Sequence, residues 1–193
     1  MNSGSTASII TTARLLLEPV NRHHATAMFA GLSDARGYAF IPDTPPESIS
    51  ALAAEYAGLE SGTSPDGREL WLNWVIKHLE QSDFAGYVQA TILCDEAALV
   101  IAYHIFPDFW GQGLGREAVA AMLAYCRAQF NVREARAYID TRHTRSTRLV
   151  EALGFTRLTV LPRTDFFGGQ VSDEVVYRLV WPGTKQGRDR DRH

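Results

Sequence analysis

The sequence is poor in cysteine. Only two cysteines occur among its 193 residues, Cys94 and Cys126, and neither belongs to a Cys-x-x-Cys pair or a Cys/His cluster with metal-ligand spacing. These two residues offer no disulfide framework, and no metal site is expected. Cys94 ends a strand-like run and Cys126 falls on the apolar side of a helical run. We therefore expect two buried thiols and a cytoplasmic protein.

Long hydrophobic runs and an excess of positive charge are also missing. No apolar stretch reaches the ~20 residues that cross a bilayer, and the N-terminus MNSGSTASIITTAR lacks the basic segment and apolar core of a signal peptide. The formal net charge is -3 and the sequence pI is about 6.1, which argues against a general nucleic-acid binder. We expect neither a membrane nor a nucleic acid as a partner.

What the chain does contain is enough apolar sequence for one sizeable core. Hydrophobic residues make up 46% of the 193 positions, which suits a single domain. Residues 1–11 are small and polar, so we expect a flexible lead there. The charged segment 182–193 is expected to be a disordered tail. The domain then spans residues 12–181.

The periodicity of apolar residues divides this domain into strands and helices. In the first part we expect a strand at 14–20, a helix at 21–32 capped by Asn21, a proline-broken loop at 38–46 and a helix at 47–60. Three β-rich runs at 69–79, 84–93 and 97–106 indicate an antiparallel meander. There follow a helix at 116–130, a strand at 134–140, a helix at 144–153 ended by Gly154, and strands at 155–161 and 171–181. The order β-α-α-β-β-β-α-β-α-β-β predicts an α+β fold with a mixed sheet.

The run FWGQGLGREAVAAML, which begins at Phe109, places three glycines at alternate positions directly before a helical segment. Glycine inside a regular element costs roughly 0.5–1 kcal/mol relative to alanine. A strand, a glycine-rich turn and a helix in succession direct several backbone N–H groups at one point, at the positive end of the helix. This arrangement predicts an anion site, although a plain tight turn remains an alternative.

Two familiar nucleotide-binding loops do not fit these glycines. A P-loop needs a lysine after its last glycine, and none follows here. A dinucleotide-binding loop needs the spacing G-x-G-x-x-G after a first parallel strand, whereas Gly111, Gly113 and Gly115 have the spacing G-x-G-x-G after a meander. A nucleotide-binding regulator is therefore disfavoured.

A closer match combines two segments, PDFWGQGLGREA from Pro107 and YIDTRHTRSTRLVEALGF from Tyr138. Together they resemble the GCN5-related N-acetyltransferase (GNAT) superfamily, within it the branch of the bacterial ribosomal-protein N-terminal (alanine) acetyltransferases. The resemblance covers roughly residues 12–181, with its specific motifs in 107–155. It implies a mostly antiparallel, twisted sheet flanked by helices, and an enzyme that uses acetyl-CoA.

The resemblance also implies which residues bind coenzyme A. The loop backbone should hold the pyrophosphate, through Gly111, Gln112, Gly113, Leu114, Gly115 and Arg116. The strand before the loop should be splayed from the next one, so that the pantetheine arm pairs with backbone near Ile105, Phe106 and Pro107. Arg148 matches the arginine of the family's S-x-R motif, and Arg142 or Arg145 could meet the 3′-phosphate. A solvated helix face is the alternative for these arginines.

The second motif departs from the family at two positions. His143 stands where relatives have an asparagine that faces the coenzyme, and an imidazole cannot copy the paired donor and acceptor of an amide. His143 is either a coenzyme contact or a solvent-facing loop residue. Val150 stands where many relatives have a tyrosine acid. Ser146 is then the candidate acid, or simply a serine that bonds the backbone at the helix start.

Two residues are candidates for the base that takes a proton from the acceptor amine. Asp165 lies in the segment expected to be the loop of the final hairpin and aligns loosely with an acidic residue of the ribosomal-protein acetyltransferases. His104 lies on the strand before the glycine loop, where it either reaches the acetyl group or packs into the sheet. We favour Asp165, because its loop should face the substrate.

These residues together predict an N-acetyltransferase that moves an acetyl group from acetyl-CoA to a primary amine by direct attack in a ternary complex. A non-catalytic module that binds or senses coenzyme A is the alternative, because the usual asparagine and tyrosine are missing. The acceptor amine, a protein N-terminus or a small molecule, cannot be read from the sequence. We expect a monomer or a homodimer.

Overall fold

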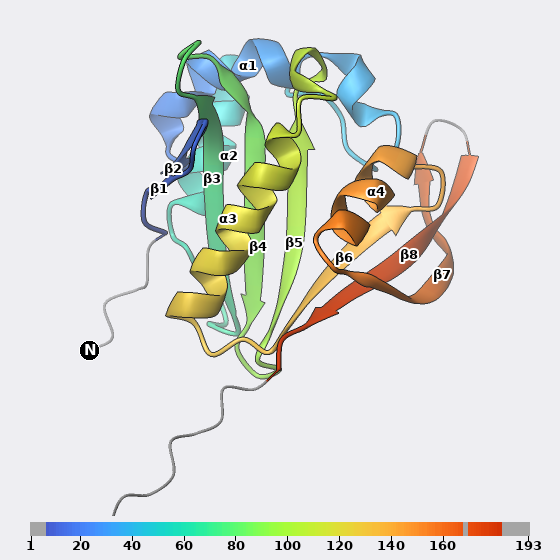
Figure 1. Ribbon diagram of the computed structural model, residues 1–193. Coiled ribbons are helices and arrows are strands. Elements are labelled where there is room, and N and C mark those ends of the chain that lie inside the picture. Colours follow the sequence, from blue (N-terminus) through green and yellow to red (C-terminus); the bar gives the residue numbers. More distant parts are fainter. Residues whose placement is uncertain (1–6, 168–169, 183–193) are drawn as a thin grey trace, which may run out of the picture.

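The computed structural model describes residues 7–167 and 170–182. Its centre is an eight-stranded sheet in the order β1-β2-β3-β4-β5-β6-β8-β7 (Figure 1). Every neighbouring pair is antiparallel except β5 and β6, which are parallel. The strands are β1 Ile10–Thr11, β2 Leu15–Pro19, β3 Glu69–His78, β4 Phe84–Leu93, β5 Ala98–Ile105, β6 Glu134–Asp140, β7 Thr156–Phe167 and β8 Gln170–Val180.

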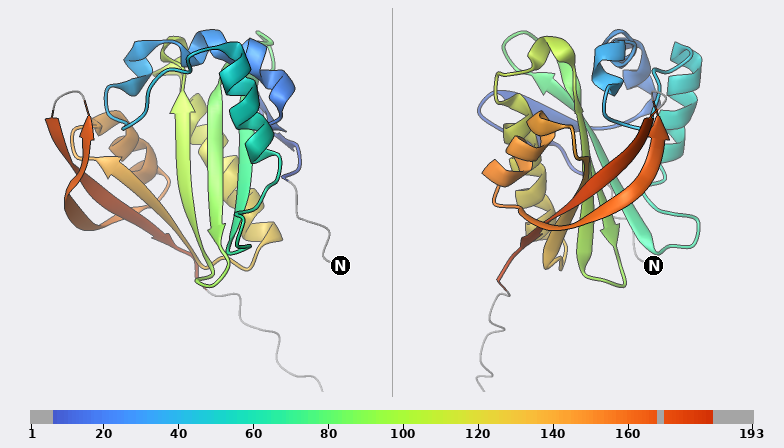
Figure 2. Two further views of the ribbon diagram at one scale, coloured as in Figure 1. Left: turned by 180° about the vertical axis from the view of Figure 1, so that it is seen from behind. Right: turned by 90° about the vertical axis from the view of Figure 1, so that its right-hand side faces the viewer.

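Helices cover both faces of this sheet. The helices α3 (Leu114–Gln129) and α4 (Thr144–Ala152) lie on the face toward the viewer in Figure 1. The helices α1 (Ala25–Leu32) and α2 (Ile49–Leu59) lie on the other side, where the view from behind shows α2 against the strands (Figure 2). Short 3-10 turns, η1 Arg22–His24, η2 Ala35–Tyr38 and η3 Pro107–Phe109, join these elements.

The core has two parts because the central strands alternate. On β3, Leu72, Trp74 and Ile76 belong to the cluster that α3 completes, and α3 contributes its residues at positions 118, 119, 122 and 126. Val75 points to the opposite face, where it joins the smaller cluster beneath α1 and α2. The period of two along strands and of 3.6 along helices therefore sorts apolar side chains onto the correct faces.

The predicted order of elements is confirmed, including the meander β3-β4-β5 and the cap on the first helical turn, where Asn21 accepts from the amide of His23. Three differences stand out. Ile10 and Thr11 form β1 within the lead that was expected to be flexible. The helix α3 begins at Leu114, two residues early, and the last two strands extend across most of the segment predicted to be their loop.

The expectation of two buried thiols is wrong for one cysteine. Cys126 is fully buried on α3, as its apolar neighbours predicted, but Cys94 is exposed. Cys94 follows the last residue of β4 and lies in the turn to β5, so no opposing layer covers it. The predicted tail falls almost entirely outside the described residues.

The feature that positions the site is a split in the sheet. Only Ala98, Leu99 and Val100 of β5 pair with β6, although β5 continues to Ile105. Beyond Val100 the two strands diverge, and Figure 1 shows them open toward the C-terminal end of β5. The splay that the family resemblance predicted is therefore present. Within the part of the chain described, no helix is long and apolar enough to cross a membrane.

Candidate functional site

The glycine loop lies between η3 and α3, at the mouth of this split. Gly111 and Gly113 have φ angles of 77° and 76°, a left-handed conformation that side chains disfavour. Gly113 is the N-cap of α3, so the first turn of the helix follows directly. Gly115 has a different role, because a Cβ there would come within 3.0 Å of the Ile105 and Leu149 side chains. The loop therefore gives backbone N–H groups at a free helix start.

Arg14, just before β2, holds this loop from behind. Its guanidinium donates to the carbonyl oxygen of Gln112 at 2.9 Å and pairs with the Glu117 carboxylate at 2.6 Å. Glu117 also accepts from the Thr12 hydroxyl at 2.6 Å. Burial alone would raise the pKa of Glu117, but these hydrogen bonds outweigh it and lower the pKa. The one carboxylate in the first turn of α3 is thus neutralised locally, which leaves the helix start available to an anion.

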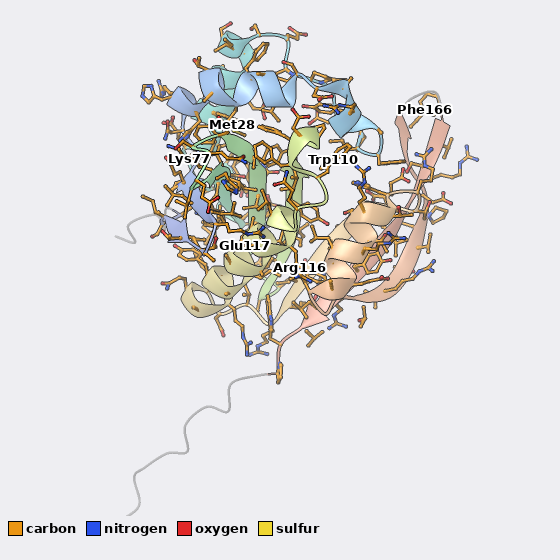
Figure 3. All side chains as sticks on the ribbon, turned by 45° about the horizontal axis from the view of Figure 1, so that its top comes forward. Met28, Lys77, Trp110, Arg116, Glu117 and Phe166 are labelled. Atoms are coloured by element: carbon orange, nitrogen blue, oxygen red, sulfur yellow. The ribbon has the colours of Figure 1, made fainter. Side chains whose placement is uncertain are left out.

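A cavity of about 560 Å³ opens from the loop into the gap between β5 and β6. Its walls come from η2 and the residues after it, the end of β5, the glycine loop, and the facing sides of α3 and α4. Of the predicted site residues, the lining includes His104, Ile105, Gly111, Gly113, Leu114, Gly115, Arg116, His143, Ser146 and Arg148. Figure 3 labels Trp110 and Arg116 on the α3 side of this gap. Segments far apart in the sequence therefore share one cavity.

The backbone of β5 offers hydrogen-bonding groups to this gap. The amide of Phe106 donates to the carbonyl oxygen of Ala85 on β4. Because the groups of an antiparallel strand alternate in direction, the amide of Ile105 points away from β4, toward the gap. The amide of Phe106 is thus already used by β4, and Pro107 has no N–H to offer. Ile105 is the residue of the three whose amide is placed for a ligand.

Ser146, in the first turn of α4, faces β5. Its hydroxyl lies 2.7 Å from the Tyr103 hydroxyl, and both residues line the cavity. Ser146 is 7% exposed. Burial raises the pKa of Tyr103 to about 12, although its hydrogen bond with Ser146 acts in the opposite direction. The phenol therefore keeps its proton at neutral pH, and the pair can pass a proton toward the cavity.

His104 follows Tyr103 on β5 and so points to the opposite face of the sheet. Its ring lies between those of Tyr87, at 5.6 Å, and Tyr38, at 5.2 Å between centroids. His104 is 5% exposed, and its Nε2 atom has no hydrogen-bond partner within the described residues. Burial lowers the pKa of His104, and the charges of Asp43 and Asp34 offset only part of this effect. The imidazole is therefore neutral at pH 7.

Gly37 lets η2 approach this imidazole closely. A Cβ at Gly37 would lie 2.5 Å from the Nε2 atom of His104, too close for any side chain. The same glycine lines the cavity. Asp34 helps to hold η2 in place, because it caps this turn by accepting from the amide of Arg36. The turn η2 thus brings the backbone, rather than a side chain, against the imidazole.

His143 is half-buried at the start of α4. Its ring stacks on that of Phe40 with 5.0 Å between centroids, and burial lowers the pKa of His143. Because the ring lines the cavity, His143 is not a solvent-facing loop residue. Phe40 belongs to the segment after η2, so this stack joins that segment to α4 across the gap.

The four arginines around the cavity differ in their availability. Arg142 pairs with Asp140 at 2.6 Å, and the Arg145 guanidinium lies 4.1 Å from the centre of the Trp110 ring. Arg116 and Arg148 line the cavity and take part in none of the ion pairs found among the described residues. Arg116 and Arg148 are therefore two cations that a bound anion can use.

Comparison with known proteins agrees with this geometry. The family described as "Acetyltransferase (GNAT) domain" matches residues 14–156. The chain belongs to the GNAT acetyltransferase family. This GNAT protein is 22% identical over 178 residues to YoaA of Bacillus subtilis (strain 168), described as an uncharacterized N-acetyltransferase, and the match covers 90% of this chain and 97% of YoaA. The enzyme class is therefore N-acetyltransferase.

Solved structures show the same fold. RimL, the ribosomal L7/L12 α-N-protein acetyltransferase in complex with coenzyme A, superposes with a TM-score of 0.78 at 18% identity, covering 90% of this chain and 98% of RimL. A GNAT acetyltransferase from Bacillus anthracis gives a TM-score of 0.75 at 18% identity, with coverage of 90% and 98%. The resemblance to the superfamily is confirmed, and the likeness to the ribosomal-protein branch extends to the fold.

The base that the sequence favoured in this GNAT acetyltransferase does not lie where it was expected. Asp165 was predicted in a hairpin loop, but its backbone belongs to β7 and pairs with Ser172 of β8. The reason is that β7 and β8 remain paired up to Phe167 and Gln170. Phe166 beside it is 71% exposed, near the end of the hairpin (Figure 3). The side chain of Asp165 lies outside the described residues, so its role stays a prediction.

Sequence reasoning missed several residues of this GNAT site, namely Arg14, Gly37, Phe40, Tyr103 and Trp110. Each acts through a partner elsewhere in the chain, as Arg14 does with Glu117 and Tyr103 with Ser146. The one available signal was the period of two in β5, which already placed Tyr103 and His104 on opposite faces. The other contacts depend on how the elements pack.

Proposed function

We propose that the protein transfers the acetyl group of acetyl-CoA to a primary amine by direct attack of the amine within a ternary complex. The observation that carries this proposal is the arrangement at the end of β5. There a cavity leads from a free helix start into the sheet, with the Tyr103–Ser146 pair on one side and a neutral His104 on the other.

The cavity suits coenzyme A in its charge and in its backbone groups. The amides at the start of α3 favour the pyrophosphate, and Arg116 and Arg148 supply positive charge without an ion-pair partner among the described residues. The amide of Ile105 faces the gap, where it can donate to an amide carbonyl of the pantetheine arm or to the thioester oxygen. A donor aimed at the thioester oxygen would stabilise the negative charge that develops there during attack.

The chemistry then needs a base for the amine and an acid for the thiol. The amine nitrogen forms a bond to the acetyl carbon, the carbon–sulfur bond breaks, and the amine gives up one proton. We propose His104 as the acceptor of that proton in place of Asp165, because His104 lines the cavity, is neutral and has a ring nitrogen without a partner among the described residues. Ser146 donates its hydroxyl proton to the departing sulfur. The Tyr103 hydroxyl is placed to donate a proton to Ser146 in turn.

A non-catalytic module that binds coenzyme A is the second candidate, favoured by His143 and Val150 at the positions where relatives have asparagine and tyrosine. Val150 is fully buried on α4 and has no proton to give. The Tyr103–Ser146 pair supports catalysis instead, because it supplies a hydroxyl at the cavity wall. A module that only binds would have no use for a buried acid and a buried base on either side of one strand.

Two measurements separate these candidates. Isothermal titration calorimetry with acetyl-CoA tests the cofactor site, and a thiol-release assay with primary alkylamines, diamines, amino acids and peptides tests transfer. We expect binding together with amine-dependent release of coenzyme A. Binding without release for every amine would favour the non-catalytic module, and the absence of binding would overturn the assignment of the cavity.

A further inference from the structure

A second cavity lies on the other face of the sheet, beneath α2. Its volume is about 270 Å³, and its lining includes residues of α2, residues 43, 44 and 46 after η2, and residues of β3 and β4. Figure 2 shows α2 lying against the sheet on this side. The lining includes three tyrosines, two carboxylates and two side-chain amides, namely Tyr38, Tyr56, Tyr87, Asp43, Glu55, Asn73 and Gln89. This cavity shares none of its lining with the one assigned to coenzyme A.

The charge of the second cavity has one sign. Asp43 and Glu55 lie at its exposed rim, and its lining, as far as the structure describes the chain, includes no lysine, arginine or histidine. Neither carboxylate takes part in an ion pair within the described part of the chain. Burial and the charge of Asp43 raise the pKa of Glu55. Two unpaired carboxylates that disfavour each other's charge are stabilised by a cation between them.

A buried hydroxyl inside the cavity points to the same kind of ligand. Tyr56 on α2 is only 5% exposed, and its hydroxyl has no hydrogen-bond partner among the described residues. A buried hydroxyl without a partner has lost its hydrogen bonds to water, so a ligand that bonds with it recovers that free energy. The Tyr38 hydroxyl, in contrast, is occupied because it donates to the carbonyl oxygen of Leu32 at 2.7 Å. Tyr56 therefore offers a ligand a buried hydroxyl that has no partner among the described residues.

Two tyrosine rings separate the second cavity from the candidate base. Tyr38 and Tyr87 line this cavity, and their rings also hold His104 between them. His104 in turn lines the cavity assigned to coenzyme A. A molecule in the second cavity therefore has carboxylates at the rim and, beyond the Tyr38 and Tyr87 rings, the proton acceptor. Aromatic rings favour a cation over their faces.

We propose that the second cavity binds the acceptor, and that the acceptor is a small aliphatic diamine. This proposal rests on the function proposed above. One amino group is directed to His104 and the acetyl group, while the second remains an ammonium ion held by Asp43, Glu55 and the Tyr56 hydroxyl. In the reaction the unprotonated first amine gains a bond to the acetyl carbon and loses a proton to His104, while the carbon–sulfur bond breaks and the departing sulfur takes a proton from Ser146. Acceptors with a carboxylate near the amine are repelled by the same two acids.

The test compares acceptors of equal length that differ only in their second end. The probes are 1,5-diaminopentane, pentylamine and 5-aminopentanoate, assayed for release of coenzyme A from acetyl-CoA. We expect kcat/KM to be highest for the diamine and lowest for the aminopentanoate. Glu55→Gln and Asp43→Asn should each reduce the ratio of kcat/KM for diamine over pentylamine about fivefold, because a rim ion pair contributes about 1 kcal/mol.

Glu47→Gln is the matched control, since Glu47 precedes α2, is exposed and does not line the cavity. It should leave the ratio unchanged, and thermal melting should show that all variants are folded. Tyr56→Phe should raise KM for the diamine more than it changes kcat, which a merely structural role would not do. A supporting result is loss of diamine preference in the two acid variants but not in the control.

The outcomes distinguish this proposal from the function on which it rests. Equal turnover of pentylamine and diamine, or an unchanged ratio in both acid variants, would overturn the diamine site while transfer to amines stood. A peptide N-terminus turned over faster than every diamine would also overturn it. No release with any amine, although acetyl-CoA binds, would overturn both proposals.

Discussion

Two neighbouring residues of β5 place the candidate acid and base. Tyr103 faces α4 and bonds with Ser146, whereas His104 faces the tyrosines beneath α1 and α2. A strand reverses the direction of its side chains at every residue, so a single step along the chain separates the two groups by the thickness of the backbone. Neither group can then neutralise the other by direct contact.

Ser146→Ala should reduce kcat far more than it changes KM for acetyl-CoA. Loss of a general acid typically lowers the rate about 10²–10⁴-fold, whereas the Ser146 hydroxyl is not needed for binding at the start of α3. Tyr103→Phe should have a smaller effect, of about tenfold, because Ser146 keeps its own proton. Steady-state kinetics decide this, and a Ser146→Ala enzyme with full kcat would remove the serine from the mechanism.

His104 should control the acidic limb of the pH profile. Burial lowers the pKa of His104 below the ordinary value of 6.5, so the imidazole is unprotonated and can act as a base at neutral pH. It becomes protonated, and stops acting as a base, only when the pH falls below this lowered pKa. We expect kcat/KM to decline on the acidic side of pH 6.5. His104→Gln should lower the rate and abolish this limb.

Asp165→Asn is the contrasting variant for this measurement. It should keep both the rate and the acidic limb if His104 is the base. The opposite pattern, with the limb lost in Asp165→Asn and retained in His104→Gln, would return the role to Asp165. Both profiles should be measured with the same amine, since the amine's own titration contributes to kcat/KM.

At the scale of single residues, the sequence indicated which residues line the site better than it indicated which side chains contact one another. It indicated Ser146 from the family motif and His104 from its place on the strand before the glycine loop, although it favoured Asp165 as the base. It could not indicate Arg14, because its contacts are with Gln112 and Glu117, which lie 98 and 103 residues further along the sequence. Cys94 was predicted to be buried because an apolar run precedes it, but that run does not reveal the turn in which Cys94 is exposed.

At the scale of elements, the glycine loop and α3 form one unit. Gly113→Val should weaken binding of acetyl-CoA at least about tenfold, because a β-branched residue at φ 76° is strained and its side chain would press on the Arg14 guanidinium that holds the loop. Isothermal titration calorimetry gives the dissociation constant directly. Unchanged affinity would show that the pyrophosphate lies elsewhere.

Gly67→Val is the control for this variant. Gly67 has a similar φ angle of 71°, in the turn before β3, and a Cβ at this position would have no heavy atom within 4 Å. The backbone strain is therefore comparable, but Gly67 does not line the cavity assigned to coenzyme A. Gly67→Val should lower the melting temperature while leaving the affinity for acetyl-CoA unchanged.

Helices and central strands were predictable because each has a clear apolar period, as α3 has at Val119, Met122 and Cys126. The length of the two strands in the final hairpin could not be predicted in this way. Residues 162–170 read as a loop because they include a proline and two glycines, yet β7 pairs with β8 as far as Phe167. A register shift between Leu161 and Asp165 absorbs the irregular part of the segment.

At the scale of the whole molecule, the sheet consists of two parts joined by three residue pairs between β5 and β6. A ligand in the gap contacts both parts. Acetyl-CoA at 100 times its dissociation constant should raise the free energy of unfolding by about 2.7 kcal/mol, which thermal melting would detect. Hydrogen exchange at the Ile105 amide should slow when the ligand is present. An unchanged Ile105 amide alongside tight binding would contradict its proposed contact.

The two cavities have no lining residue in common, and the rings of Tyr38 and Tyr87 stand between the second cavity and His104 in the first. Donor and acceptor therefore do not compete for one entrance, and either can arrive or depart while the other is still bound. We expect initial-rate plots that intersect rather than run parallel, and product inhibition without a compulsory order. A single molecule that joins coenzyme A to an amine should then occupy both cavities at once and inhibit more strongly than either half.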